Sequence, residues 1–326
     1  MRVFVTGATG FIGSAISGAA KANEVLGTIA QAQSLIYGPG PYKVAPGGDH
    51  GGSFIGFDPK LGPLQNNGGD TATMALLPGS PAIGHGATMS MIPGLGGVVA
   101  VDQRGYSRPA NSIDIGAVQT LTPRQRFVES LYLDFLHRTG DLNNPIDAGS
   151  WVTHLNQGMP AATVANAIAR SPEALGVAVD GLYQRFLGRS ADPAGRAGFV
   201  SYLQNGGTLE GASQAMLASP EYQSHFASGD AFVQSLYQNL LLRTGSNAEV
   251  GGWVALLPQM GRAGVANAFL SSQEYRTVEV IDDYTKLLDR AQPPSAAEVS
   301  GWVGAGFDLL TIDAHIAGSP EYQMDG

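Results

Sequence analysis

The sequence contains no cysteine, which excludes disulfide bonds, thiolate metal sites and cysteine nucleophiles. Charged residues are scarce, at 14% of the 326 residues, and only four of them are lysines. No apolar run reaches the roughly 18 residues that a membrane span needs, and the start MRVFVTGATG has no recognisable secretory signal. The net charge of −9 argues against a nucleic-acid partner held through its phosphates. What remains is a weakly charged chain whose 44% of hydrophobic residues can form a packed core.

The two parts of the chain differ in charge and in local pattern. Residues 1–120 carry six basic and six acidic side chains, whereas residues 121–326 carry twelve basic and twenty-one acidic ones. Turn dipeptides break up the first part, while the second has apolar residues at helical spacing. The Thr-Pro-Arg-Gln stretch at 122–125 has the signature of a helix start. We therefore expect a domain boundary between residues 120 and 121.

Residues 121–326 contain four copies of one unit of about 50 residues. The copies span residues 123–175, 176–223, 230–276 and 279–323. Each has a tyrosine six residues before an arginine, then an aromatic residue followed by valine, and a Ser-x-Glu tetrapeptide at its end. In chain order these positions are Tyr132, Arg138, Trp151 and Glu173; Tyr183, Arg189, Phe199 and Glu221; Tyr237, Arg243, Trp253 and Glu274; and Tyr284, Arg290, Trp302 and Glu321.

Each copy predicts three short helices. In the first copy Phe127, Leu131 and Phe135 recur at i, i+4 and i+8, which places one apolar stripe on one helix. A residue that caps helices lies seven positions before each aromatic residue: Asn144, Asp192, Ser246 and Ser295. We expect an all-α array whose units stand at equivalent places along a row.

The acidic residues of the loops admit two interpretations. By ligand type Asp141, Asp147, Asp192 and Glu249 suit calcium, but no loop has the EF-hand pattern and most of these acids match helix capping. We favour capping and keep calcium as the weaker alternative. For the repeated arginines and glutamates we favour a structural ion pair over a ligand site, and for the tryptophans a place in the core over sugar stacking.

The repeat resembles a known family. Leu182-Tyr183, Phe186-Leu187, Arg189, Asp192-Pro-Ala-Gly195, Phe199-Val200 and Ser219-Pro-Glu-Tyr222 together resemble the bacterial domain-of-unknown-function family 4214. The resemblance implies an all-helical domain in a secreted or surface-layer-type protein. It transfers no catalytic residue.

Residues 53–119 predict short strands and tight turns. The order of Asn67-Gly-Gly69, Ser80-Pro-Ala-Ile83, Asp102-Gln-Arg-Gly105 and Asp114-Ile-Gly-Ala117 is similar to the closing segment of secreted right-handed parallel β-helix proteins, of the choice-of-anchor or polymorphic outer-membrane type. This resemblance implies that residues 28–120 are the truncated end and cap of a β-solenoid. For Asp102, Arg104 and Asp114 we favour a turn and a cap salt bridge over a catalytic acid pair.

Residues 1–27 carry a glycine-rich turn after a short apolar segment. Gly7, Gly10 and Gly13 have the spacing that lets a backbone approach a pyrophosphate, and the segment resembles the start of an extended short-chain dehydrogenase or epimerase. That family's catalytic tyrosine has a lysine four positions later, and no tyrosine here does. We interpret the segment as a fused, Rossmann-like fragment that does not bind a cofactor.

The combined prediction is a multi-domain α and β chain: a short glycine-rich β-solenoid end, followed by an all-α array of four repeats. We expect a non-catalytic, secreted or cell-surface protein of bacterial type with a structural or adhesive role. Cell-surface polysaccharide or other surface proteins are the expected partners, and no cofactor is expected. The alternatives are a calcium-dependent surface-assembly module, a polysaccharide-active β-solenoid enzyme fragment and, last, an NAD(P)-dependent epimerase or dehydrogenase.

Overall fold

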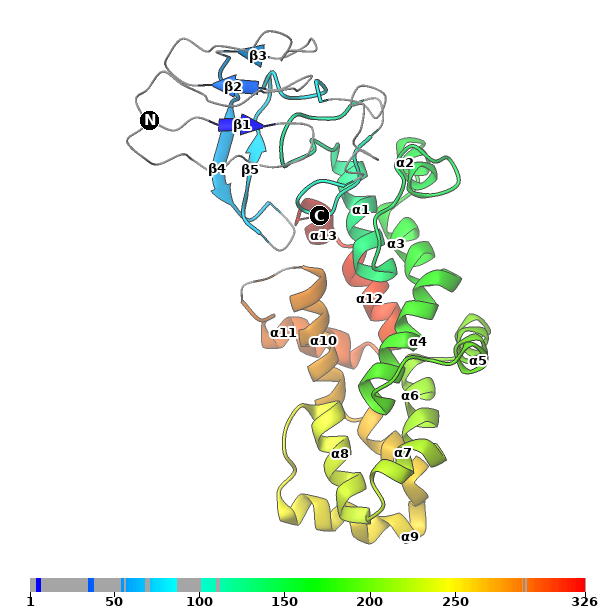
Figure 1. Cartoon of the computed structure of the whole chain (residues 1–326). Coiled ribbons are helices and arrows are strands. Elements are labelled where there is room, and N and C mark those ends of the chain that lie inside the picture. The colour runs from blue at the N-terminus through cyan, green and yellow to red at the C-terminus, as the bar shows by residue number, and fades with distance from the viewer. Residues whose placement is uncertain are drawn as a thin grey trace. The chain divides into compact units, whose positions relative to one another are not determined.

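A computed structural model describes residues 4–6, 35–37, 54–55, 57–67, 71–86, 101–109, 112–288, 290 and 292–325. These residues contain five strands and thirteen helices (Figure 1). The chain divides into two compact units, one of residues 1–133, 138–157 and 326 and the other of residues 134–137 and 158–325. Helix α1 (Pro123–Leu136) therefore contributes residues to both units. The predicted domains 1–27, 28–120 and 121–326 follow sequence patterns and not these units, and they stay a prediction.

The strands of the first unit form two small sheets. Strands β1 (Phe4–Thr6), β2 (Leu35–Tyr37) and β3 (Phe54–Ile55) make one sheet, in which β1 is antiparallel and β3 parallel to β2. Strands β4 (Leu61–Gln65) and β5 (Thr73–Leu76) make an antiparallel pair with a register shift between Leu61 and Leu64. Asn67 joins the two sides of this pair, because its side-chain amide donates hydrogen bonds to the backbone oxygen (2.8 Å) and Oγ1 (3.2 Å) of Thr73.

The predicted β-solenoid is wrong. A β-solenoid stacks parallel strands of successive coils, whereas the longest strands that the structure describes, β4 and β5, pair antiparallel. Among the described residues after β5, residues 78–84 form turns, and Ala82 packs in a small apolar core with Ile115 and Leu76. Short strands separated by glycine and proline turns are common to solenoids and hairpins. The pattern therefore identified strands and turns, but not which strands pair.

The dehydrogenase-like start also finds no support. In a dinucleotide-binding fold the first strands of the sheet run parallel, and here β1 runs antiparallel to β2. The candidate cofactor-binding residues Gly7, Gly10 and Gly13 lie outside the described residues.

The expectation of an all-helical C-terminal region is confirmed for the residues that the structure describes. The first helices of the four copies are α1, α4 (Pro172–Leu187), α8 (Gly229–Leu241) and α10 (Gln273–Leu287). The second and third helices are α2 (Ala148–Asn156) and α3 (Ala161–Ala169), α5 (Pro193–Gln204) and α6 (Leu209–Leu217), the single long helix α9 (Asn247–Leu270), and α11 (Ala296–Gly304) and α12 (Leu309–Ala317). Two short helices that the sequence did not predict, α7 (Pro220–His225) and α13 (Pro320–Asp325), follow the second and the fourth copy. In the third copy the second and third helices merge across a kink at Gly261, where φ is 66° and ψ is 171°.

Helix caps explain where the second helices begin. Ser246 and Ser295 each form a capping box, with Glu249 and Glu298 respectively, at the predicted positions. Asp192 accepts a hydrogen bond from the backbone N–H of Gly195 at the start of α5. The prediction for Asn144 is wrong: α2 begins at Ala148, and the side chain of Asn144 instead accepts from the N–H of Ile146 within the preceding turn.

The Ser-x-Glu tetrapeptides begin the helix that follows the copy they end. Ser171, Ser219 and Ser272 are the N-caps of α4, α7 and α10, and each accepts a hydrogen bond from the N–H three residues later. The tyrosines that close the last three tetrapeptides, namely Tyr222, Tyr275 and Tyr322, are among the largest fully buried side chains of the described residues. These corners thus join one copy to the next.

The copies of the second unit do not stand in a simple row. In a linear array each copy contacts only its neighbours. Here α12 of the fourth copy packs against α3 of the first and also against α6 of the second. Within this unit α6 also packs against α9, and α10 packs against α8 and α12 (Figure 1). The fourth copy therefore contributes to a core shared with all three of the others.

Candidate functional site

The repeated arginine lies over the ring of the repeated tyrosine in all four copies. The guanidinium carbon is 5.0 Å from the ring centroid for Arg138 and Tyr132 and for Arg189 and Tyr183. It is 4.7 Å away for Arg243 and Tyr237, and 4.8 Å for Arg290 and Tyr284. The six-residue spacing places the arginine just beyond the end of the first helix, where it turns back over that helix.

In the last three copies the arginine also binds the glutamate of the tetrapeptide that ends its copy, in the first turn of the helix that follows. Arg189 donates from Nε (2.5 Å) and Nη2 (2.8 Å) to the two carboxylate oxygens of Glu221. Arg243 binds Glu274 in the same two-pronged way, and Arg290 binds Glu321. Such bidentate pairs set both distance and orientation. In the first copy the corresponding residue, Glu173, lies in the first turn of α4.

A second carboxylate reaches the same arginine from the start of the second helix. The pairs are Arg138 with Asp147 (3.2 Å), Arg189 with Asp192 (3.6 Å), Arg243 with Glu249 (2.9 Å) and Arg290 with Glu298 (3.0 Å). Each arginine of the last three copies therefore ties together the end of one helix and the starts of two others. We call these groupings the arginine clusters.

The electrostatics of the arginine clusters favour permanent charges. Hydrogen bonds from Arg243 and then from Ser246 lower the pKa of Glu249 to about 2, and those from Ser295 and then Arg290 lower the pKa of Glu298 to about 2. The hydrogen bond to Glu274 raises the pKa of Arg243. Carboxylates that stay ionised and are already paired are poorly suited to proton transfer near neutral pH.

The calcium candidates are engaged in these same contacts. Asp147, Asp192 and Glu249 face arginines, and Asp141 accepts a hydrogen bond from the N–H of Asn143. Among the residues that the structure describes, no group of three or more histidine or acidic side chains is arranged to hold a metal ion.

The repeated aromatic residues are only half-buried. Trp151, Phe199, Trp253 and Trp302 all retain some exposure, although the sequence favoured a place in the core. Trp253 packs against Phe269 with ring centroids 5.0 Å apart, and Trp302 donates from Nε1 to the hydroxyl of Tyr284 (2.9 Å). They lie on second helices, which bury few residues: α5 buries only Leu203 and α11 only Val299.

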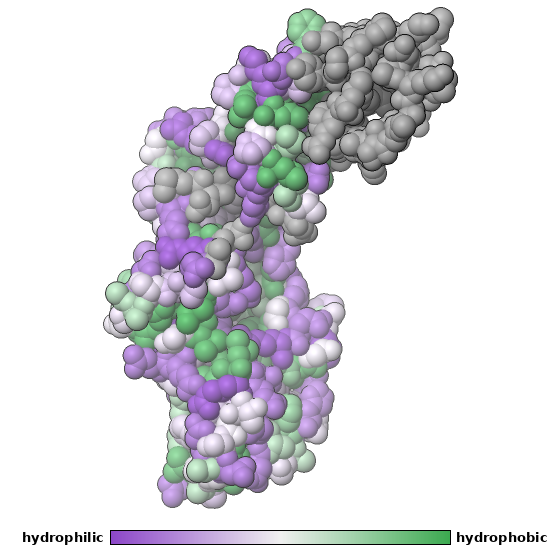
Figure 2. Space-filling model, turned by 90° about the vertical axis from the view of Figure 1, so that its left-hand side faces the viewer, coloured by the Kyte–Doolittle hydropathy of each residue, from purple (hydrophilic) through white to green (hydrophobic). Residues whose placement is uncertain are grey.

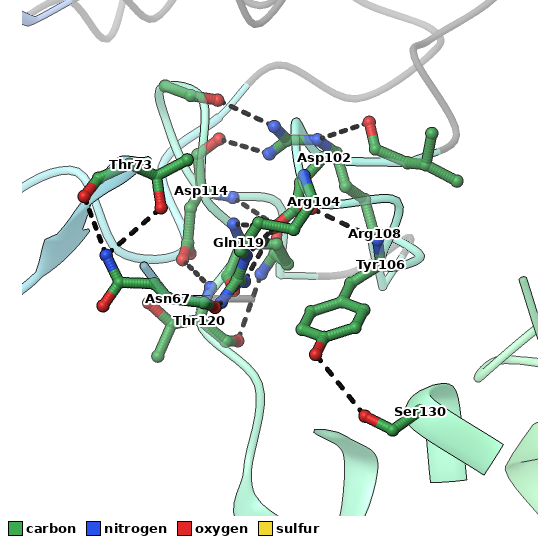
Figure 3. Close-up of polar contacts among 12 residues, drawn as sticks. Asn67, Thr73, Asp102, Arg104, Tyr106, Arg108, Asp114, Gln119, Thr120 and Ser130 are labelled. Carbon is green, nitrogen blue, oxygen red and sulfur yellow. Dashed lines mark hydrogen bonds and ion pairs between the residues drawn. The ribbon is translucent and has the colours of Figure 1, made fainter. Parts of the chain in front are cut away.

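The first unit holds a separate, buried polar cluster (Figure 3). The carboxylate of Asp102 pairs with Arg104 (2.7 Å) and accepts the backbone N–H groups of Arg104, Tyr106 and Gln119. Arg104 also donates to the backbone oxygens of Asn67 and Gln119. This set of contacts fixes the 102–106 turn against distant segments of the unit.

The remaining members of this cluster are equally well paired. Asp114 accepts the N–H groups of Gly84 (2.7 Å) and Thr120 (2.5 Å), and Arg108 donates to the backbone oxygens of Asp114 and Gly116. A catalytic acid pair needs a carboxyl group free to meet a substrate. Here Asp102 and Asp114 bind backbone N–H groups, and Asp102 also pairs with Arg104.

Sequence reasoning missed Glu129, which is fully buried in α1. Its carboxyl accepts hydrogen bonds from Ser107 Oγ (2.6 Å) and the N–H of Gly140 (3.3 Å), and burial raises its pKa to about 7. In the sequence, the position of Glu129 between Val128 and Leu131 in the first helix was a signal that this acid could be buried.

One shallow groove lies beside the kink of α9 in the second unit. It has a volume of about 510 Å³ and is lined by Ala218, Gln223, Leu257, Pro258, Gly261, Arg262 and Ala263. Arg262 donates to the backbone oxygens of Phe226 (2.8 Å) and Ala227 (2.9 Å) and lies over the ring of Phe232. The groove therefore offers mostly apolar surface and no converging set of reactive groups.

Comparison with known families supports the helical resemblance alone. The model of a domain of unknown function (DUF4214) matches residues 178–226 and 213–278. These stretches include the arginine clusters of Arg189 and Arg243. No protein with a curated description matches the chain. The comparison lends no support to the β-helix and dehydrogenase resemblances, and the matched family carries no assigned chemistry.

Proposed function

We propose that the chain is a non-catalytic, structural or adhesive protein of a bacterial cell surface. The observation that carries this proposal is the arginine cluster. Its tyrosine, arginine and acidic side chains are the most regular feature of the repeat, and they bind one another. What the last three copies have in common is thus a way of joining three helix ends, which suits a protein that works through its surface.

The remaining polar groups agree with such a role. The buried carboxylates Asp102 and Asp114 are held by backbone N–H groups, and Arg262 in the groove is bound to two backbone oxygens. On the face shown in Figure 2, hydrophobic residues form small patches among hydrophilic ones. No helix of the described residues has the length and apolar character needed to cross a membrane.

Cell fractionation tests the proposed location. An antibody against the chain is used to follow it in native cells, and we expect it in the envelope fraction or the medium. Recovery in the cytoplasmic fraction alone would contradict the proposal.

Sedimentation with insoluble cell-wall polysaccharide tests adhesion. We expect the chain to cosediment with the polysaccharide.

Thermal unfolding with and without millimolar calcium tests the alternative of a calcium-dependent assembly module. We expect an unchanged unfolding temperature, because the candidate acids are bound to arginines or to backbone N–H groups. A ligand of the folded state raises that temperature by mass action. A clear rise with calcium would therefore favour the calcium-dependent assembly module.

A further inference from the structure

The shared core of the second unit contains more carboxyl groups than positive charges. Three arginines there each have an acidic partner: Arg170 pairs with Asp308 (3.5 Å), Arg185 with Glu279 (2.8 Å) and Arg276 with Glu210 (3.5 Å). Two further acids, Asp283 on α10 and Asp313 on α12, form no ion pair among the described residues. Their charge must be neutralised in another way.

These two aspartates meet where α10 packs against α12. The side chain of Asp313 lies within hydrogen-bonding reach of Asp283. Oδ2 of Asp283 is shielded from solvent and receives no hydrogen bond from any described N–H or O–H group. Two carboxylates cannot bond to each other while both are ionised, but one proton between them makes one a donor and the other an acceptor.

Both aspartates occupy positions that are apolar or small in the other copies. Asp283 precedes the repeated tyrosine, where the first and third copies have the buried Leu131 and Leu236. Asp313 lies six residues before the tetrapeptide serine, where the other copies have three buried residues: Ala165, Ser213 and Ala266. The fourth copy has thus replaced a packed contact between two helices by a pair of acids.

We propose that Asp283 and Asp313 share one proton, and that this proton fastens α12 to α10 so that the contact weakens as the pH rises. The inference is independent of the proposed surface role. It makes the helical unit firmer in mildly acidic than in alkaline surroundings.

The charged groups around the pair act in the same direction. Glu279 and Asp282 on α10, Asp308 at the start of α12 and Glu210 on α6 all disfavour a second negative charge. Burial raises the pKa of Asp313 to about 7, although a hydrogen bond from Asp283 acts in the opposite direction. Burial and then the negative charge of Asp313 hold the pKa of Asp283 well above its usual value. The other ionisable side chains on the helices around the pair have partners of their own. Asp282 pairs with Lys286, and Glu298 and Glu321 bind Arg290. The exposed His315 contacts the backbone oxygen of Thr311, and α3 carries no ionisable side chain.

The sign of the effect follows from proton binding. In the unfolded chain an aspartate loses its proton near pH 4, whereas in the folded pair Asp313 keeps its proton until about pH 7 and Asp283, the donor, keeps the shared proton to a higher pH. The folded state therefore holds the extra proton across that window, and stability falls as the pH rises through it. A single retained proton changes the unfolding constant by up to about tenfold for each pH unit.

The test compares the unfolding of the full chain between pH 5 and pH 8 with that of matched variants. D313N keeps a neutral donor, and the double variant D283L/D313A restores the residues of the third copy. We expect both to lose most of this pH dependence. The control D282N, at a more exposed acid paired with Lys286, is expected to keep it. Comparing each variant with wild type cancels the contributions of other carboxyls such as Glu129.

Carbon-13 NMR titration of the two side chains gives a readout that does not depend on the variants. We expect the Asp313 carboxyl to titrate near pH 7. Titration of both carboxyls below pH 5, or the same pH dependence in wild type and D313N, would overturn the proposal. If calcium raised the stability of wild type at pH 8 but did not raise that of D283L/D313A, the two aspartates would bind a cation, and the proposal would be overturned.

Discussion

The two units use the same contact in opposite surroundings. In the first, Arg104 lies over the ring of Tyr106 (4.6 Å) and pairs with Asp102, and the side chains of the ion pair are 6% and 0% exposed. In the second, Arg243 lies over the ring of Tyr237 (4.7 Å) and pairs with Glu274, and the pair is 38% and 47% exposed. The geometry is alike, so the difference in exposure decides what each contact contributes.

Exposure matters because water screens charges and also solvates a charge left alone. Removing one partner of a buried pair leaves the other desolvated and unpaired, whereas an exposed partner is simply rehydrated. The stability of the first unit should therefore depend strongly on one buried ion pair, and that of the second on many small contacts repeated along the chain.

The largest effect is expected for D102N. The amide cannot neutralise the charge of Arg104, and it has fewer acceptor sites for the three backbone N–H groups that Asp102 binds. We therefore expect the free energy of unfolding of the first unit to fall by about 3–5 kcal/mol. Hydrogen exchange of peptides covering residues 101–120 measures this loss. The control is D58N, because the exposed Asp58 accepts a hydrogen bond from the N–H of Lys60. Equal protection in both variants would contradict the account.

A smaller gain is expected for L242G. Leu242 ends α8 with φ of 53°, a left-handed conformation that side chains disfavour, and it is 70% exposed, so little packing is lost. The same position in the second copy is Gly188, with φ of 63°. We expect L242G to stabilise the unit by ~1 kcal/mol and G188A to destabilise it by a similar amount, as measured by urea unfolding. A loss of stability in L242G would show that the leucine side chain has an essential contact.

The smallest effect is expected for an exposed arginine cluster. R189M removes the pair with Glu221 and should lower the unfolding temperature slightly in low salt. At 1 M salt, where charges are screened beyond about 3 Å, we expect the difference from wild type to disappear. The loss caused by D102N should persist there. A salt-independent loss in R189M would show that the guanidinium acts by packing on Tyr183.

Local signals made the helical part predictable. A capping box lies within four residues, so Ser246 and Ser295 could be placed from sequence. The prediction that Asn144 caps α2 was wrong. The carboxylate of Asp147 pairs with Arg138 and accepts the N–H of Asp141, and α2 starts later than the spacing indicates.

Long-range pairing was not predictable in the same way. The partners of Arg104 include Asn67 and Gln119, which lie far from it along the chain, and turn composition does not specify them. Turn composition also does not tell the antiparallel pairing of β4 with β5 from the parallel pairing of a solenoid. The pair of Asp283 and Asp313 is likewise absent from the repeat pattern, since the other copies have different residues there. The repeat pattern identifies contacts that all copies share, but it does not identify a contact that only one copy makes.

A double-mutant cycle on Arg243 and Glu274 tests the central claim most directly, namely that the repeated polar residues stabilise the unit by binding one another. Unfolding of wild type, R243M, E274Q and the double variant is compared at low salt. We predict that the loss in the double variant is clearly smaller than the two single losses combined, because the second change removes a partner already lost. Single losses that simply add, with no coupling, would contradict the account.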